Sequence, residues 1–330
     1  MNTQQAYDFG YREVYLTFDC IGDTILLMSA IRYLTIQKGG KILIGTFYKE
    51  VLTNCPYCDV LDDCCEEVFS FELYDRLVKT GITPIFITAT DFVKEDNLYR
   101  PVWGKSHIFA NYCNKLGITS KIDIKPVFFL SDEEKGQGRF FSNTQIAIVS
   151  SGYQKYKAIP YKIAQEIVHQ LNNKYGFVQI GSKEDPLLDG VLDKRETGGL
   201  RKTASILYNS DLFVGGIGGM MHLARAVDCR AVIAYSSAEP LIMENYICNI
   251  NVFAPEPKCA MCGNNEAFPY FIKCPNGYSC ISGIRTSDMI QAIKKQLDTE
   301  TSNLEFESMF VEGQKAVGMS DYIKRFGSIK

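Results

Sequence analysis

Short runs of β-branched and aromatic residues alternate along the chain with longer stretches in which apolar residues recur at helical spacing. This alternation predicts strands joined by amphipathic helices, the pattern of a parallel sheet covered by helices. The first part of the chain follows it, with predicted strands at residues 14–18, 41–45 and 84–89 and predicted helices at residues 23–37 and 104–116.

A polar stretch with two glycines, residues 131–144, interrupts the pattern and has the composition of a linker. The alternation then resumes. The later predicted strands are residues 145–149, 177–180, 212–215 and 231–235, and the later predicted helices are residues 160–174, 201–209, 219–227 and 286–297.

The sequence therefore predicts an α/β protein with two Rossmann-like domains, residues 1–135 and 136–298. Residues 299–330 form a polar tail in which Phe306, Phe310, Tyr322 and Phe326 have the spacing of a helix that packs back on the body. In such an arrangement we expect the ligand site in the cleft between the halves, at the carboxyl ends of the strands.

The charge balance limits the partners of this protein. Its 330 residues carry 35 basic and 38 acidic side chains, which excludes the basic surface that a duplex nucleic-acid binder needs. No apolar run approaches the roughly 18 residues of a membrane span, and the first residues lack the apolar core of a secretory signal. We therefore expect a cytoplasmic protein with no nucleic-acid partner and at most peripheral membrane contact.

The densest chemical signal is the glycine-rich segment Val214-Gly215-Gly216-Ile217-Gly218-Gly219-Met220-Met221-His222-Leu223-Ala224, between a predicted strand and a predicted helix. Glycines there let a ligand approach the backbone, and a helix N-terminus offers free N–H groups to a diphosphate. The same composition is also typical of a tight strand–helix turn. The chain has neither a P-loop nor a GxSxG elbow, and its first strand is not followed by the GxGxxG of a dehydrogenase.

Several motifs occur in an order that resembles a known family. They are Gly22-Asp23, Lys157-Ala158-Ile159-Pro160, Gly181-Ser182-Lys183-Glu184-Asp185, Gly198-Gly199-Leu200, Asp211-Leu212-Phe213-Val214 and Gly219-Met220-Met221-His222-Leu223-Ala224. The ordered set, from about residue 15 to residue 293, resembles the bacterial heptosyltransferases of glycosyltransferase family nine, which have the GT-B fold of two Rossmann-like domains facing across a cleft.

The resemblance implies an inverting glycosyltransferase with a nucleotide-diphosphate sugar, ADP-heptose, as donor. Asp23 would be the general base, and Lys157 would neutralise the leaving diphosphate, without a catalytic divalent metal. Read from the residues alone, Asp23 is an N-cap for the following helix and Lys157 a solvated surface lysine. The implied donor-binding set is Gly22, Ser151, Lys157, Gly181, Ser182, Glu184, Leu200, Gly218, Gly219, Met220, Met221 and His222, with Asp185 as an alternative to Glu184.

The chain departs from the family pattern at Ile217 and Gly218, where the family carries an acidic residue and a serine or threonine. The departure leaves the donor sugar open and motivates a second hypothesis, a non-catalytic nucleotide-sugar-binding or scaffold protein. The resemblance implies an acceptor hydroxyl on either a lipopolysaccharide-type glycan or a protein, and the sequence leaves this choice open. An oligomer is compatible with the resemblance.

The 12 cysteines fall into groups. In a reducing compartment, clustered cysteines indicate metal ligands rather than disulfides. Cys259, Cys262, Cys274 and Cys280, within a predicted finger at residues 257–282, have the spacing of a tetrahedral structural Zn or Fe site, which we favour over free thiols. A second group, Cys55, Cys58, Cys64 and Cys65, is also ligand-like, but we interpret it as chance spacing of buried residues.

Overall fold

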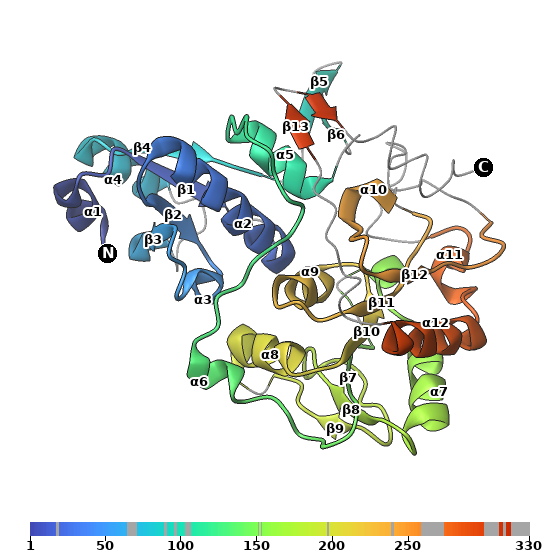
Figure 1. The fold of residues 1–330 in the computed structure, drawn as a ribbon. Coiled ribbons are helices and arrows are strands. Elements are labelled where there is room, and N and C mark those ends of the chain that lie inside the picture. The colour runs from blue at the N-terminus through green and yellow to red at the C-terminus, as the bar shows by residue number, and fades with distance from the viewer. Residues whose placement is uncertain are drawn as a thin grey trace. The chain divides into compact units, whose positions relative to one another are not determined.

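The computed structural model describes residues 1–17, 20–64, 71–88, 91–95, 98–102, 107–150, 152, 154–196, 198–238, 241–258, 274–299, 310–312 and 315–317 (Figure 1). The chain divides into two compact units, which we describe separately. Unit 1 comprises Met1–Asp91, Ser106–Phe129 and Ser308–Lys330, and unit 2 comprises Phe92–Lys105 and Leu130–Glu307.

Unit 1 contains a parallel sheet with the strand order β3-β2-β1-β4. Its strands are β1 (Glu13–Thr17), β2 (Ile42–Thr46), β3 (Cys58–Val60) and β4 (Thr83–Phe86). Its helices are α1 (Thr3–Phe9), α2 (Ile21–Lys38), α3 (Lys49–Leu52), η1 (Asp62–Cys64), α4 (Phe71–Thr80) and α5 (Ile108–Lys115), of which α2 packs with α5 and α1 with α4. The strand order reverses at β1, because β2 and β4 lie on opposite sides of it.

Unit 2 contains a parallel sheet with the strand order β12-β11-β10-β7-β8-β9. Its strands are β7 (Gln145–Ile148), β8 (Gly176–Gln179), β9 (Leu192–Asp193), β10 (Leu212–Gly216), β11 (Ala231–Ala234) and β12 (Ile250–Val252). The four central strands are buried along their whole length, as expected for a parallel sheet covered on both faces. The strand order reverses between β7 and β10.

The helices of unit 2 pack in pairs around this sheet (Figure 1). Helix α7 packs with α12, α8 packs with α9, and both α9 and α12 contact β10 and β11. The helices are α6 (Asp132–Lys135), η2 (Lys155–Lys157), α7 (Tyr161–Leu171), α8 (Gly199–Tyr208), α9 (Gly219–Ala226), α10 (Leu241–Glu244), α11 (Ser279–Ser282) and α12 (Thr286–Asp298).

All seven strands predicted from the sequence are present as β1, β2, β4, β7, β8, β10 and β11. Within the two large sheets, the strands not predicted are β3, β9 and β12, which have two or three residues each. Such short strands leave little periodic signal. Helix α2 begins at Ile21 rather than at Asp23, so that Cys20 is the N-cap residue and Asp23 lies in the first turn. The interpretation of Asp23 as an N-cap is therefore wrong.

The polar stretch at residues 131–144 is fixed to unit 2. Ser131 and Glu134 form a reciprocal capping box at the start of α6, and Glu134 forms an ion pair with Arg201 of α8. Arg139 forms a second ion pair with Asp211, 2.8 Å apart. The polar side chains that give this stretch the composition of a linker are therefore used to bind it to the neighbouring helix and strand.

Two further strand pairs lie outside the large sheets. Strands β5 (Asp91–Glu95) and β6 (Leu98–Val102) form one pair, and β13 (Phe310–Glu312) pairs antiparallel with β14 (Lys315–Val317). Phe310 thus lies in a strand where the aromatic spacing predicts a helix, and Phe306, Tyr322 and Phe326 lie outside the described residues.

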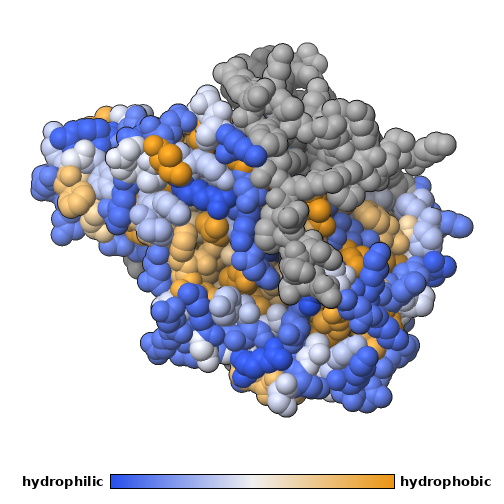
Figure 2. Space-filling view, viewed as in Figure 1, coloured by the Kyte–Doolittle hydropathy of each residue, from blue (hydrophilic) through white to orange (hydrophobic). Residues whose placement is uncertain are grey.

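Hydrophilic residues cover most of the described part of the face shown in Figure 2, with hydrophobic residues in scattered groups. Among the described residues, none of the helices combines the length and the apolar character that crossing a membrane needs.

Candidate functional site

The carboxyl edge of the unit 2 sheet, at the point where the strand order reverses, is where open α/β sheets bind ligands. Two segments leave the sheet there. The chain after β7 leads to η2, which ends at Lys157, and the chain after β10 turns through Gly218 into α9. Since β7 and β10 are hydrogen-bonded neighbours, the topology places Lys157 and the start of α9 at one edge of the sheet.

The glycines of the segment after β10 differ in what lies next to them. A Cβ atom on Gly216 would lie 1.8 Å from the carbonyl oxygen of Lys157, so Gly216 leaves room for protein backbone rather than for a ligand. We call the backbone segment that approaches it, residues 154–158, the lysine loop. Gly215 similarly lies against Val149. Gly218 has open space around its Cβ position but a φ of 137°, a conformation that side-chain-bearing residues rarely adopt. Packing within unit 2 therefore accounts for Gly215 and Gly216.

Four side chains form a buried cluster next to this turn, which we call the Lys157 cluster: Lys157, Glu244, His222 and Tyr246. Lys157 Nζ lies 2.8 Å from Glu244 Oε1, and His222 Nε2 lies 3.5 Å from Glu244 Oε2. The other ring nitrogen of His222, Nδ1, lies 2.7 Å from the hydroxyl of Tyr246. The side chains of Glu244 and His222 are each 4% exposed, whereas that of Lys157 is 19% exposed. Lys157 is therefore the member that reaches solvent.

Glu244 carries a negative charge in this cluster. Burial alone would raise its pKa, but the charge of Lys157 and the hydrogen bond with His222 outweigh burial and hold the pKa of the carboxyl well below its usual range. Burial raises the pKa of Tyr246 well above its ordinary value, so its hydroxyl is protonated. The ionised Glu244 carboxylate can only accept, so His222 Nε2 carries the proton that faces it, and in the neutral ring Nδ1 then accepts from the Tyr246 hydroxyl.

Lys157 and His222 were predicted from the sequence, whereas Glu244 and Tyr246 were not. Both lie in and after the short helix α10, in a segment without a motif. The interpretation of Lys157 as a solvated surface lysine is wrong, since its ammonium is paired with a buried carboxylate.

The loop after β8 holds further predicted donor residues. Gly181 has a φ of 126°, and the turn is closed by the Ser182 backbone N–H, which donates to Asp185 Oδ2 at 2.9 Å. Asp185 therefore serves the turn, whereas Glu184 is exposed and accepts a hydrogen bond from the Ser182 hydroxyl, which lowers its pKa. Leu200, the second residue of α8, is 6% exposed.

Arg195 holds the loop after β8 in place through a hydrogen bond to the backbone of Asp185. This arginine was not predicted from the sequence. Its buried guanidinium bonds to both carboxylate oxygens of Asp193, each at 2.9 Å, and to the backbone carbonyl of Asp185. The guanidinium thereby connects the end of β9 to the turn that carries Glu184.

In unit 1, Asp23 occupies the equivalent place at the carboxyl end of β1, where the strand order of that sheet reverses. Its neighbour Gly22 is buried. The exposed Cys20 thiol donates to Asp23 Oδ2 at 2.9 Å. The half-buried carboxylate is thus oriented by its own helix N-cap residue.

Other predicted site residues divide between described and undescribed parts of the chain. Met220 is half-buried and Met221 is buried. Ser151, Cys259 and Cys262 lie outside the described residues. Cys280 is buried against Tyr156 and Ala238, and Cys274 is half-buried. Within the part of the chain that the structure describes, no three potential ligands are grouped around a metal position.

The second cysteine group is described only in part. Cys55 and Cys58 are free and buried, at 8% and 4% exposure.

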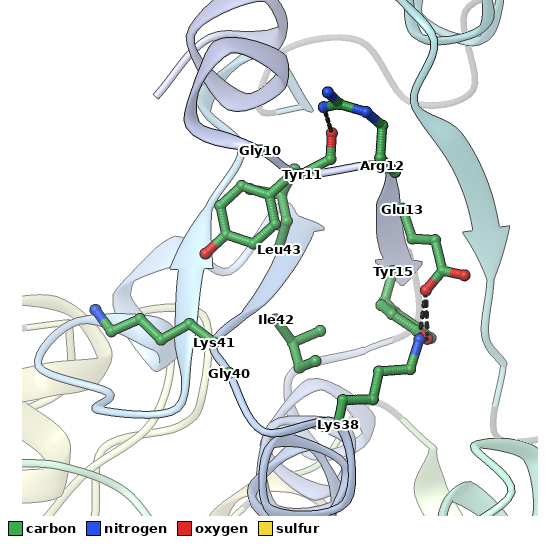
Figure 3. Close-up of a pocket in the computed structure, with 10 residues that line it drawn as sticks. All are labelled: Gly10, Tyr11, Arg12, Glu13, Tyr15, Lys38, Gly40, Lys41, Ile42 and Leu43. Atoms are coloured by element: carbon green, nitrogen blue, oxygen red, sulfur yellow. Dashed lines mark hydrogen bonds and ion pairs between the residues drawn. The ribbon is translucent and has the colours of Figure 1, made fainter.

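A pocket of about 240 Å³ lies at the opposite, amino edge of the unit 1 sheet (Figure 3). Arg12 and Glu13 at the start of β1 and Lys41 before β2 line it, and Lys38 crosses it to pair with Glu13 and with the Tyr15 hydroxyl. Since α/β sheets bind ligands at their carboxyl edges, this pocket is not the candidate site.

No protein-family model matches the sequence, and no curated protein is similar to it. The fold, however, is that of solved glycosyltransferases, and we identify it as an α/β fold of the GT-B type. The glycosyltransferase of family nine from Veillonella parvula superposes with a TM-score of 0.62 at 13% identity, covering 87% of this chain and 97% of that one.

Two structures from E. coli are similarly related. ADP-heptose lipopolysaccharide heptosyltransferase II has a TM-score of 0.63 at 12% identity, covering 86% of this chain and 98% of that one. The iron-containing dodecameric glycosyltransferase TibC from the enterotoxigenic bacterium has a TM-score of 0.65 at 14% identity, covering 87% of this chain and 76% of that one.

Proposed function

We propose that this protein is an inverting glycosyltransferase that moves a sugar, heptose, from an ADP-linked donor to a hydroxyl group. The observation that carries the proposal is the Lys157 cluster, a lysine paired with a buried carboxylate beside a glycine-started helix, at the carboxyl edge of a GT-B sheet. Solved structures with this fold include a heptosyltransferase with ADP and TibC with ADP-heptose, which supports ADP as the nucleotide.

On the donor side, the diphosphate is the group that gains charge as the sugar leaves. The Lys157 ammonium and the N–H groups at the start of α9 are the cationic and dipolar groups that would take up this charge. Because the chain itself supplies this field, we expect no requirement for a divalent metal. Glu184 would hold a ribose or sugar hydroxyl, and Leu200 would cover the base.

On the acceptor side, Asp23 would act as general base. The acceptor oxygen attacks the anomeric carbon, the bond from that carbon to the diphosphate oxygen breaks, and the acceptor proton passes to the Asp23 carboxylate. The acceptor is a hydroxyl of a lipopolysaccharide-type glycan or of a protein.

A non-catalytic nucleotide-sugar-binding protein is the second candidate. It is favoured by Ile217, which is 5% exposed and offers no polar group where the resembling family carries an acid. Such a protein would bind the donor without turning it over, so a transfer assay separates the two candidates.

Ligand-induced thermal stabilisation tests the donor assignment. With a panel of ADP-, GDP-, UDP- and dTDP-sugars, ADP-heptose is expected to stabilise the protein most, by about 2.7 kcal/mol at about 100 times its Kd. Lys157→Ala should abolish most of this shift, while Lys155→Ala, an exposed lysine on the same turn, should retain it. A preference for UDP- or dTDP-sugars would contradict the ADP-heptose assignment.

We also propose that Cys259, Cys262, Cys274 and Cys280 hold a structural Zn or Fe, because four thiolates leave no open coordination position. TibC, a solved glycosyltransferase with this fold, contains iron, which supports iron as the metal. Elemental analysis should find about one metal ion per chain in protein purified without chelator, and Cys259→Ser should lower that content, whereas Cys113→Ser should not. A metal-free wild-type protein would refute the site.

A further inference from the structure

Glu244 is a buried carboxylate that has no direct role in the proposed sugar transfer. Its two carboxylate oxygens are divided between two partners, Oε1 facing Lys157 and Oε2 facing His222. A buried ion costs several kcal/mol in lost hydration, which is offset only where its partners are well placed. The partners of Glu244 come from different elements, η2 and α9, so the carboxylate connects the lysine loop to the helix that follows the glycine turn.

We propose that Glu244 is a positioning residue for the donor diphosphate site, which acts by holding the Lys157 ammonium in a fixed place relative to the start of α9. The inference rests on the proposed function, because only a nucleotide-diphosphate donor supplies the diphosphate that the Lys157 ammonium would bind.

The freedom of the lysine side chain explains why such a residue is useful. An unrestrained lysine loses up to about 2 kcal/mol of rotamer entropy when it is ordered. In this structure the backbone of Lys157 is confined by Gly216 and its ammonium is confined by Glu244, so both ends of the side chain are set before a donor arrives. Groups that are placed in advance stabilise a transition state without reorganisation.

His222, the second partner of Glu244, restrains the position of α9 in the same way. His222 is the fourth residue of that helix, and its two ring nitrogens are held by Glu244 and by the Tyr246 hydroxyl. A shift of the helix relative to the lysine loop would separate His222 from Glu244. The Glu244 carboxylate therefore fixes the position of the Lys157 ammonium relative to the N-terminus of α9.

The substitution Glu244→Gln removes the charge and keeps the shape. The amide still accepts from Lys157, and its NH₂ group is accommodated by His222 through the other tautomer, since the Tyr246 hydroxyl can also accept. We expect the fold to persist, kcat for sugar transfer to fall about 10- to 100-fold and KM for the donor to change little. Glu244→Asp, which retains the charge, should recover part of the loss.

A double-mutant cycle with Lys157→Met shows whether Glu244 acts through the lysine. In the Lys157→Met background, Glu244→Gln should cost no further activity, and it should raise the melting temperature because it removes an unpaired buried charge. Equal losses of kcat in the two backgrounds would refute the positioning role, as would an unchanged kcat in Glu244→Gln alone.

A readout independent of turnover separates this inference from the proposed function. Peptide-resolved acetylation with acetic anhydride should modify Lys157 about tenfold faster in Glu244→Gln than in wild type, because the ammonium loses its ionic partner. Lys155 serves as the control within the molecule and should react at the same rate in both proteins. Absent transfer in the wild type would refute the proposed function, whereas an unchanged acetylation rate at Lys157 would refute the role of Glu244.

Discussion

Asp23→Asn is expected to lower the rate of sugar transfer about 10²- to 10⁴-fold, the range that a general base contributes. The amide has the shape of the carboxylate and can still accept the hydrogen bond from the Cys20 thiol, but it cannot take a proton from an acceptor hydroxyl. Initial-rate measurements with saturating donor, combined with the thermal shift produced by the donor, would test this expectation.

The thermal shift should be the same in Asp23→Asn as in the wild type, because Lys157, the start of α9, Glu184 and Leu200 lie in unit 2 and the substitution leaves Gly22 unchanged. Asp8→Asn, which changes an exposed aspartate on α1 of the same unit, should transfer sugar at the wild-type rate. Transfer at full rate in Asp23→Asn would show that another group accepts the proton.

Gly216→Ala is expected to destabilise the protein by about 3 kcal/mol, because the new methyl group would overlap the carbonyl oxygen of Lys157 and force the lysine loop away from β10. For a unit of this size the loss corresponds to a fall in Tm of about 6–12 °C, measured by differential scanning calorimetry. The displaced loop should also lose most of the donor-induced thermal shift.

Gly40→Ala is the matched control. A Cβ atom on Gly40 would have no neighbour within 4 Å, and the residue does not adopt a left-handed conformation. Its stability should stay within about 0.5 kcal/mol of the wild type. A Gly216→Ala protein with wild-type stability and a full thermal shift would mean that the lysine loop does not depend on this contact.

The central strands could be predicted from the sequence because their burial is local information. Runs such as Leu212–Gly216 are apolar at every position, which is the signature of a parallel strand covered on both faces. The start of α2 could not be placed to the residue, since Cys20 is an uncommon N-cap and Asp23, a common one, follows three positions later.

The alternation of strands and helices is enough to place some of the candidate residues at the carboxyl edges of the sheets. The Gly218–Gly219 turn follows β10, and Asp23 lies in the first turn of α2, the helix that follows β1. Arg195 and Glu244 were not predictable in this way, because each acts through partners that the local pattern does not indicate.

The sequence by itself determined two parallel α/β sheets and the residues that leave their carboxyl ends, since strand burial and glycine turns are encoded over a few neighbouring positions. Only the tertiary structure decided what surrounds Lys157. Glu244 is 87 positions away along the chain, and Tyr246 is 24 positions from His222. A charge pair over such a separation depends on how the loops pack at the edge of the sheet. That packing also gave Gly216 its role, which is to admit the lysine loop.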